Sequence, residues 1–267
     1  VRGKVKDLCF SNPSIKELTE QSGCELFFLA LPHGTAASYA VPLLESGKKV
    51  IDLSADFRLT TSDTYEEFYG SPHPSPKWLE KAAYGLPEIH SLSWEKSRLI
   101  ASPGCYPTSL LIPLFPLLQN KLIQKQDIIA NSMSGVSGAG RNATVKLLFC
   151  ERNESACAYG LPKHRHLSEI EEQLSIAADN EVILSFHPHL APMNRGICST
   201  ISSLPEGKLD RSTIIECWKE FYHGRKFVHI LDEDEFPDVK NVVGTNRIDI
   251  SVSADRRTGR YIICSAE

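Results

Sequence analysis

The chain has 267 residues, with 29 lysines and arginines against 33 aspartates and glutamates, for a formal charge of −4. Hydrophobic residues make up 42% and charged residues 23%, which is typical of folded globular proteins and excludes intrinsic disorder. The mild acidity argues against a nucleic-acid partner. No apolar stretch of the sequence reaches the ~20 residues of a membrane-spanning helix, so we expect no membrane partner. The length predicts one large domain or two modest ones.

The eight cysteines are scattered along the sequence, and none of them forms a CxxC pair. This spacing argues against a zinc ribbon or a thioredoxin-type motif, so we expect no bound metal. Scattered thiols in a chain of this length are typical of a reducing compartment. We therefore expect a cytoplasmic location, or an organellar one if a transit peptide preceded Val1.

Short apolar runs alternate with tight turns over the first hundred residues. The pattern predicts a buried strand at 25–31, a helix at 35–46, and further strands at 49–53 and 99–101. This order is typical of a parallel α/β sheet, in which ligands bind at the carboxyl ends of the strands. Between the last two strands, residues 60–97 contain four prolines among aromatic residues. There we expect an irregular, ordered segment with one short helix near 77–83.

The second half of the sequence changes character and predicts an α+β arrangement. A helix at 108–119 is expected to bend at its prolines, and a hairpin is expected to end the chain. The other expected elements are strands at 127–131, 182–186 and 197–203, helices at 142–151, 168–178 and 210–222, and hairpin strands at 248–254 and 260–266. Ser168 and Asp210 are the expected N-caps of their helices. We place the domain boundary near residue 107, with domains at 1–107 and 108–267.

The first chemical candidate is the turn Ser-Pro-Gly-Cys-Tyr-Pro-Thr at 102–108, between a predicted strand and a predicted helix. A thiol at a helix N-terminus lies at the positive end of the helix dipole, which lowers its pKa and favours the nucleophilic thiolate. Cys105 is therefore a candidate nucleophile. The alternative interpretation is a small buried thiol at a tight turn, because free cysteines usually pack as small hydrophobic residues.

The second candidate is His164-Arg165-His166, just before a predicted helix. Two imidazoles around a guanidinium suit both acid–base chemistry and anion binding. The alternative is a solvated polar loop. His187-Pro188-His189 has the same pattern, but here a polar strand end without a chemical role is the favoured interpretation.

The third candidate is the glycine-rich turn 134–141, SGVSGAGR. Its backbone N–H groups and Arg141 can line an anion site. The turn matches neither a Walker A motif nor GxGxxG, and a flexible loop is the alternative.

Six stretches of the sequence, taken in order, resemble the N-acetyl-gamma-glutamyl-phosphate reductase family. They are LPHG at 31–34, DLSADFR at 52–58, PGCYPT at 103–108, SGVSGAGR at 134–141, HRH at 164–166 and NVVG at 241–244, and YGLPE at 84–88 also fits. The resemblance implies a Rossmann-type dinucleotide-binding domain with its N-terminal part missing. A glyceraldehyde-phosphate-dehydrogenase-like α+β domain for substrate binding and oligomerisation would follow, in a homodimer or homotetramer.

The same resemblance implies a small-molecule substrate and a reaction. Enzymes of this family belong to arginine biosynthesis and reduce an acyl phosphate with NADPH to a semialdehyde, with release of phosphate. Cys105 would form a thioester, and His164 would act as the acid–base and orienting group. The implied substrate-binding residues are Arg141, Tyr159, Arg165 and His166. The implied NADP contacts are Pro32, His33, Ser54, Ser137, Gly138, Ala139, Gly140 and Asn241.

The sequence departs from the family pattern at both ends, and three alternative functions stay open. The family begins with a strand and a glycine-rich phosphate loop, which are absent before Cys24 and from the basic segment 1–6, and it continues past Glu267. We therefore expect the chain to be a fragment of such an enzyme. An aspartate-semialdehyde-dehydrogenase-like enzyme is one alternative, because it shares the chemistry without needing room for an N-acetyl group. A non-catalytic binding protein derived from the fold and a Cys–His hydrolase that needs no NADP are the others.

Overall fold

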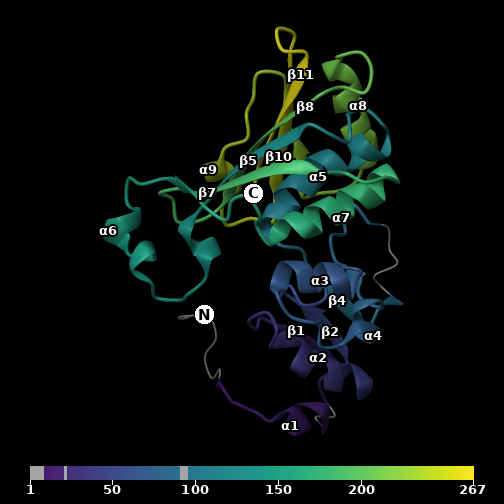
Figure 1. Ribbon diagram of the computed structural model, residues 1–267, viewed down its shortest axis with the longest axis vertical. Helices are drawn as coiled ribbons and strands as arrows, with labels where there is room; N and C mark the ends of the chain where they lie inside the picture. Colours follow the sequence, from purple (N-terminus) through teal and green to yellow (C-terminus); the bar gives the residue numbers. More distant parts are fainter. Residues whose placement is uncertain (1–8, 21–22, 91–95) are drawn as a thin grey trace.

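The structure is a computed structural model in which residues 9–20, 23–90 and 96–267 are described. Within those residues the strands form two sheets, one with the order β1-β2-β4-β3 and one with the order β6-β7-β5-β8-β11-β10-β9. Figure 1 shows the first sheet with its helices in the lower part of the view and the larger sheet above it. The basic segment 1–6, in which the sequence shows no phosphate loop, lies outside the described residues. No helix in the described part of the chain combines the length and hydrophobicity needed to cross a membrane.

The first sheet is parallel throughout, as the alternation of strands and helices predicts. Its elements are α1 Ile15–Glu20, β1 Leu26–Leu29, α2 Ala36–Glu45, β2 Lys49–Asp52, α3 Ser62–Tyr69, α4 Pro76–Leu79, β3 Ala83–Tyr84 and β4 Leu99–Ala101. The helix predicted at 35–46 and the strand predicted at 99–101 are confirmed. The carboxyl ends of β1, β2 and β4 therefore lie at one edge of the sheet.

Two predictions for the first half are wrong. The strand at 25–31 is not buried, because β1 is an edge strand on which Leu26 is 46% exposed and Phe28 is 66% exposed. The segment 60–97 also contains more regular structure than one short helix. Helix α3 begins after Thr61, whose side chain accepts a hydrogen bond from the Thr64 N–H, and ends at Gly70 in the left-handed conformation.

The second half combines a seven-stranded mixed sheet with three long helices in the described residues. Its elements are α5 Cys105–Gln119, β5 Ile128–Ser134, α6 Phe149–Arg152, β6 Cys157–Ala158, α7 His166–Ala178, β7 Leu184–Leu190, β8 Ile197–Ser203, α8 Arg211–Phe221, β9 Val228–Ile230, α9 Val239–Val242, β10 Ile248–Asp255 and β11 Arg260–Ala266. Short 3₁₀ turns lie at Val136–Ala139 and Val145–Leu147. The predicted strand at 197–203, the antiparallel hairpin and the Asp210 cap of α8 are confirmed.

Two helix predictions for the second half are wrong. Residues 142–151 do not form one helix, because Leu148 is extended between a 3₁₀ turn and the four-residue α6. Val145 and Phe149 on this segment are 71% and 81% exposed, so no apolar helix face packs against the body of the protein. Ser168 is not an N-cap, since α7 already begins at His166 and the Ser168 hydroxyl donates to the Arg165 carbonyl.

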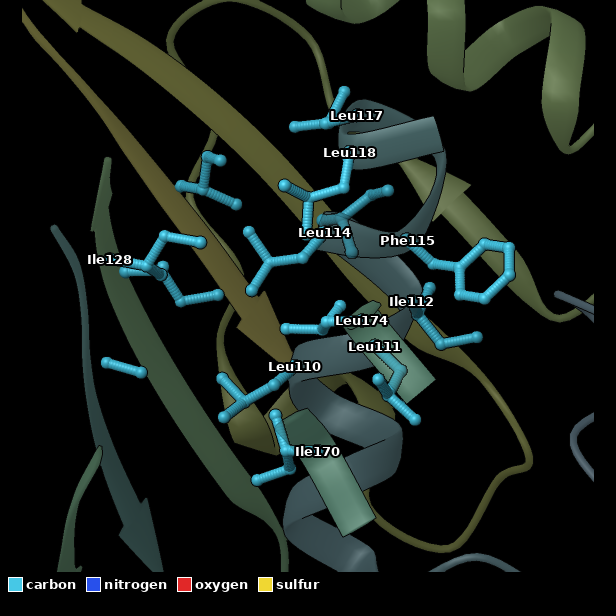
Figure 2. Close-up of a cluster of buried hydrophobic side chains, with 14 of the residues drawn as sticks. Leu110, Leu111, Ile112, Leu114, Phe115, Leu117, Leu118, Ile128, Ile170 and Leu174 are labelled. Carbon is cyan, nitrogen blue, oxygen red and sulfur yellow. The ribbon is translucent and has the colours of Figure 1, made fainter. Parts of the chain in front are cut away.

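Helix α5 is the centre of the larger core, and it begins at Cys105. Figure 2 shows leucines of this helix between Ile128 of β5 and Ile170 and Leu174 of α7. Because α5 leaves β4 of the first sheet and packs against the second sheet, it links the two halves of the molecule. The expected boundary near residue 107 falls in its first turn and stays a prediction.

The two prolines inside α5 leave two helix carbonyls without their usual N–H donors. Side chains from the second half supply the missing hydrogen bonds. The Ser265 hydroxyl donates to the Ser109 carbonyl at 2.8 Å, and the Tyr222 hydroxyl donates to the Ile112 carbonyl. These bonds satisfy buried polar groups and fix the helix whose first residue is Cys105.

Candidate functional site

The carboxyl ends of the first sheet's strands open into one cavity of about 920 Å³. His33 lines it after β1, Ser54 after β2, and Gly104 and Cys105 after β4. The volume lies within the range of about 300–1,000 Å³ that is typical of ligand pockets. The edge that the strand order predicts as a ligand site is therefore hollowed in the structure.

Two buried aspartates of the DLSADFR stretch shape this edge. Asp56 accepts hydrogen bonds from the Gly34 N–H at 2.7 Å and from the Ala37 N–H at 3.0 Å. It thereby holds the turn that carries His33 against the first turn of α2. Asp52 accepts from the Ser54 N–H at 2.9 Å and from its hydroxyl at 2.7 Å. The two aspartates thus act as a scaffold for the loops that border the cavity.

Cys105 lies where the large cavity meets a second cavity of about 370 Å³. Ser134 and Gly138 line both cavities together with Cys105. The sequence-based expectation of a lowered thiol pKa is wrong. Desolvation by the cavity wall and, second, the nearby carboxylate of Glu267 raise the pKa of Cys105 to about 11, although the backbone N–H groups of Cys105 and Tyr106 act in the opposite direction. Cys105 is still exposed to the cavity, but these two effects together outweigh the field of the helix N-terminus. The thiol therefore needs a base that takes its proton during attack.

His164 and His166 supply two such bases beside the cavity. Burial and the positive charge of Arg165 lower the pKa of His164 to about 4. Burial, followed by the nearby His164 and Arg58, lowers the pKa of His166 well below its ordinary value. Both imidazoles are therefore neutral at physiological pH and can accept a proton.

The ring of His166 packs directly against the turn that precedes the thiol. A Cβ placed on Gly104 would lie 2.8 Å from the His166 Nε2 atom, so only glycine fits there. The His164 Nδ1 atom accepts a hydrogen bond from the His166 backbone N–H at 3.1 Å, which fixes the two rings relative to each other. Among the described residues no hydrogen bond joins Cys105 to either imidazole, and the buried Nδ1 of His166 has no partner.

Two tyrosines frame the histidines from the other side. The hydroxyls of Tyr106 and Tyr159 lie 2.8 Å apart. The ring of Tyr106 meets the ring of His164 edge-on with a centroid distance of 5.6 Å. Tyr159 lines the large cavity, which is the location that the resemblance implies for it.

A buried network behind Cys105 was missed by the reasoning from sequence. Arg58 and Glu169 are 8% and 1% exposed and form an ion pair at 3.3 Å. Glu169 also accepts hydrogen bonds from the Gly104 N–H at 2.9 Å and the Tyr84 hydroxyl at 2.6 Å. Arg58 donates to the Ser102 carbonyl at 2.7 Å. The network therefore holds the backbone on which the thiol is mounted. Arg58 ends the DLSADFR stretch and Tyr84 begins the YGLPE stretch, so the sequence did indicate these two members of the network.

The structure brings most of the predicted site residues together. The large cavity is lined by His33, Ser54, Cys105, Gly138, Ala139, Tyr159, His164, Arg165 and His166. Ser137 lines the smaller cavity, and Gly140 joins Ser137 in a third, shallower hollow. Pro32 lies between two lining residues, and its carbonyl accepts from the Thr35 N–H.

Two predicted residues do not reach the site. Arg141 and Asn241 are exposed and line neither cavity. His187 is bound within its sheet instead, since its ring contacts Ser185 and Asn131. In the described part of the chain no group of three or more His, Cys, Asp or Glu side chains could hold a metal ion.

Two family models match the chain. The model for the semialdehyde dehydrogenase NAD-binding domain matches residues 2–97. The model for the semialdehyde dehydrogenase dimerisation domain matches residues 105–267, more than half of the chain.

Solved structures with the same fold include aspartate semialdehyde dehydrogenases. The enzyme II from Vibrio cholerae matches with a TM-score of 0.67 at 14% identity, covering 91% of this chain and 73% of that one. The enzyme from Candida albicans with NADP matches with a TM-score of 0.63 at 13% identity, covering 91% and 72%. At these identities the likeness shows the fold alone.

Three sequence relatives are more similar to this chain and carry the name N-acetyl-gamma-glutamyl-phosphate reductase. The protein from Akkermansia muciniphila is 52% identical over 94% of this chain and 72% of its own length. The protein from Geotalea daltonii is 46% identical over 91% and 70%, and that from Caldicellulosiruptor saccharolyticus is 44% identical over 98% and 75%. The chain therefore belongs to the N-acetyl-gamma-glutamyl-phosphate reductase family of semialdehyde dehydrogenases.

Proposed function

We propose that the protein reduces N-acetyl-glutamyl 5-phosphate with NADPH to N-acetyl-glutamate 5-semialdehyde and phosphate, a step of arginine biosynthesis. The observation that carries the proposal is the position of Cys105, at the first residue of α5 and beside two neutral imidazoles. Relatives that are 44–52% identical carry the name of this reductase, which supports the substrate. The aspartate semialdehyde alternative has only the shared fold in its favour.

The first step is acyl transfer to sulfur. The Cys105 Sγ atom attacks the carbonyl carbon, the bond between this carbon and the phosphate oxygen breaks, and phosphate leaves with the electron pair. We assign the thiol proton to His164, the ring that the family resemblance implies for this role; its Nδ1 atom gives up the hydrogen bond from the His166 N–H to receive it. The N–H groups of Cys105 and Tyr106, at the start of α5, are donors for the carbonyl oxygen as it gains negative charge.

The open edge of the first sheet suits a nicotinamide dinucleotide. When bound, the cofactor supplies the hydride that reduces the thioester. Small residues at Gly138 and Ala139 leave the cavity open opposite the strand ends. We assign the cofactor contacts to this turn and to the loops that hold His33 and Ser54. We propose NADP as the cofactor, since the Candida albicans enzyme of the same fold is described with NADP.

The second half of the chain supports self-association. Its match to a dimerisation-domain model favours a homo-oligomer, and we propose a homodimer or homotetramer. The sedimentation coefficient of the purified protein at several concentrations tests this, since a monomer at all concentrations would contradict it.

Phosphate-dependent turnover tests the reaction. Purified protein with N-acetyl-glutamate semialdehyde and NADP is expected to form NADPH only when inorganic phosphate is present. Cys105→Ser abolishes this turnover, whereas Cys24→Ser, a change at an exposed thiol of the first half, retains it. Equal turnover of aspartate semialdehyde favours the aspartate enzyme, and turnover without NADP favours a hydrolase. A folded protein with no turnover favours the binding-protein alternative.

Separate substitutions test the assignment of the base. His164→Asn is expected to lower kcat by about 10²–10⁴-fold, the usual contribution of a general base. His166→Asn is expected to have a smaller effect on kcat, because its ring packs against Gly104 and positions the turn that carries the thiol. The reverse order would assign proton transfer to His166.

A further inference from the structure

One side of the large cavity is closed by a segment that the sequence motifs do not explain. Residues 144–157 run through a 3₁₀ turn and α6 to β6, and they form the projecting loop that bears α6 in Figure 1. The residues of this segment that line the cavity are Thr144, Lys146, Leu147, Arg152 and Cys157. None of the five was a candidate site residue in the sequence.

The charge of the cavity lining is positive on several sides. Its cationic or titratable basic residues are His33, Arg58, Lys146, Arg152, His164, Arg165 and His166. No aspartate or glutamate lines the cavity among the residues that the structure describes. Arg58 is neutralised by Glu169, and Arg165 contacts His33. Lys146, Arg152 and Arg165 form no ion pair with any residue in the described ranges. The cavity therefore suits an anionic ligand, and Lys146 and Arg152 add two unpaired positive charges to that of Arg165.

The guanidinium of Arg152 is held in place but is not satisfied. Its Nη1 atom lies 3.1 Å from the Cys157 Sγ atom, a weak hydrogen-bond acceptor. Its Nε atom is buried and has no hydrogen-bond partner among the described residues. A buried donor without a partner is unfavourable unless a ligand completes it. The planar donor fork of an arginine matches the two oxygens of a carboxylate or a phosphate.

We propose that Arg152, assisted by Lys146, is an anion subsite that binds an oxyanion group of the substrate. This inference rests on the proposed function, in which the substrate carries a carboxylate at one end and a phosphate at the other. Of the two arginines that the resemblance implies for substrate binding, Arg165 lines the cavity and contacts His33, whereas Arg141 is exposed and lines neither cavity. Arg152 reaches the same cavity as Cys105 from a segment outside the recognised motifs.

Steady-state kinetics of Arg152→Gln and Lys146→Gln test the subsite. Arg256→Gln, in the exposed turn between β10 and β11, is the matched control. We expect Arg152→Gln to raise one substrate KM by about 10–100-fold, the range for a lost charge-assisted hydrogen bond, with kcat within about threefold. Lys146→Gln gives a smaller rise, because its compact charge cannot bind two oxygens at once. Arg152→Lys restores part of the loss, since it keeps the charge without the fork.

The identity of the affected KM distinguishes the two sources of the oxyanion. A raised KM for the semialdehyde, which keeps the carboxylate, assigns the carboxylate to Arg152. A raised KM for inorganic phosphate in the reverse direction assigns the phosphate group, and either result supports the subsite. A raised KM for NADP alone, or no raised KM in either variant, overturns it.

A binding measurement separates failure of the subsite from failure of the proposed function. Calorimetric titration of N-acetylglutamate and of inorganic phosphate needs no turnover. Weaker binding of either probe to Arg152→Gln than to the wild type supports the subsite even if the wild type proves inactive. Equal binding of both probes to the two proteins overturns it, and unchanged thermal unfolding of Arg152→Gln shows that the variant is folded.

Discussion

The two sides of Cys105 differ in how their charges are satisfied. Behind the thiol, Glu169 meets the Arg58 guanidinium, the Gly104 N–H and the Tyr84 hydroxyl in a region closed to water. In front of it, the cavity wall carries Arg152, whose Nε has no partner among the described residues. The polar groups behind the thiol are thus paired within the protein, whereas Arg152 Nε keeps a hydrogen-bond donor for a ligand. The rear network fixes the backbone, and the wall provides recognition.

Removing one partner from the rear network should have the largest effect on stability. Glu169→Ala leaves the Arg58 charge buried without compensation and the Gly104 N–H without an acceptor. We expect a loss of about 3–5 kcal/mol in the free energy of unfolding. Equilibrium unfolding in urea, monitored by tryptophan fluorescence, measures this difference.

The matched control is an ion pair on the surface. Lys163 and Glu67 lie 2.6 Å apart, but their side chains are 46% and 62% exposed. Glu67→Ala should therefore change the free energy of unfolding by only about 0–1 kcal/mol, as exposed ion pairs usually do. If Glu169→Ala and Glu67→Ala lowered the free energy of unfolding by similar amounts, the buried network would stabilise the fold no more than a surface ion pair does.

A smaller but more local effect is expected at the junction of the two sides. Gly104→Ala places a Cβ 2.8 Å from the His166 ring and 3.0 Å from the Arg58 guanidinium. We expect a loss of about 1–3 kcal/mol in stability from this overpacking. We also expect turnover to fall about 100-fold, because the thiol and the imidazole shift relative to each other.

Gly207→Ala is the control for the methyl group itself. Nothing lies within 4 Å of a Cβ at Gly207, so stability and turnover should both stay close to wild type. If Gly104→Ala behaved like Gly207→Ala, the packing of His166 against the thiol's turn would have no part in catalysis.

The pH dependence of thiol reactivity tests the raised pKa of Cys105 without changing any residue. Because desolvation and the Glu267 carboxylate raise the pKa of Cys105 to about 11, the thiolate fraction is small at neutral pH. In the free protein, alkylation of Cys105 by iodoacetamide should accelerate about tenfold per pH unit from neutrality to about pH 10. Mass spectrometry of the peptide that contains Cys105 follows this residue among the other thiols. A plateau below about pH 8 would show instead that the helix N-terminus prevails over burial.

The sequence predicts elements well where periodicity and caps coincide. The strands at 99–101 and 197–203, the terminal hairpin and the Asp210-capped helix agree with the structure because each has a clear apolar pattern with turn residues beside it. The sequence pattern did not predict α3 within the segment 60–97, although Thr61 is a helix start signal and Gly70 a helix stop signal. The prolines of this segment favoured an irregular structure instead.

Tertiary context decided the elements that were predicted wrongly. The run at 25–31 is apolar enough for a buried strand, but β1 lies at a sheet edge, and only the assembled sheet shows this. Residues 142–151 have a helical composition, yet no surface of the protein covers Val145 or Phe149, so a long helix gains nothing there.

The candidate site likewise contains residues that short motifs predict and residues that only the folded structure brings together. Cys105, His164 and the glycine turn follow from short motifs, because their residues lie close together in sequence. The pair of Arg58 and Glu169 joins positions 111 residues apart, and no local pattern connects them. Arg152 lies in no recognised motif, and only the folded structure shows that the segment 144–157 brings it to the cavity. The thiol pKa also depended on burial, which a sequence does not report.

In the proposed reaction, Cys105 carries the acyl group as a thioester. The most direct measurement is the burst of NADPH formed when N-acetyl-glutamate semialdehyde and NADP are mixed with the protein in the absence of phosphate. We predict a single equivalent of NADPH per chain, an N-acetylglutamyl adduct on Cys105 in the intact mass, and renewed turnover when phosphate is added. Continuous turnover without phosphate, or a burst that persists in Cys105→Ser, would contradict the claim.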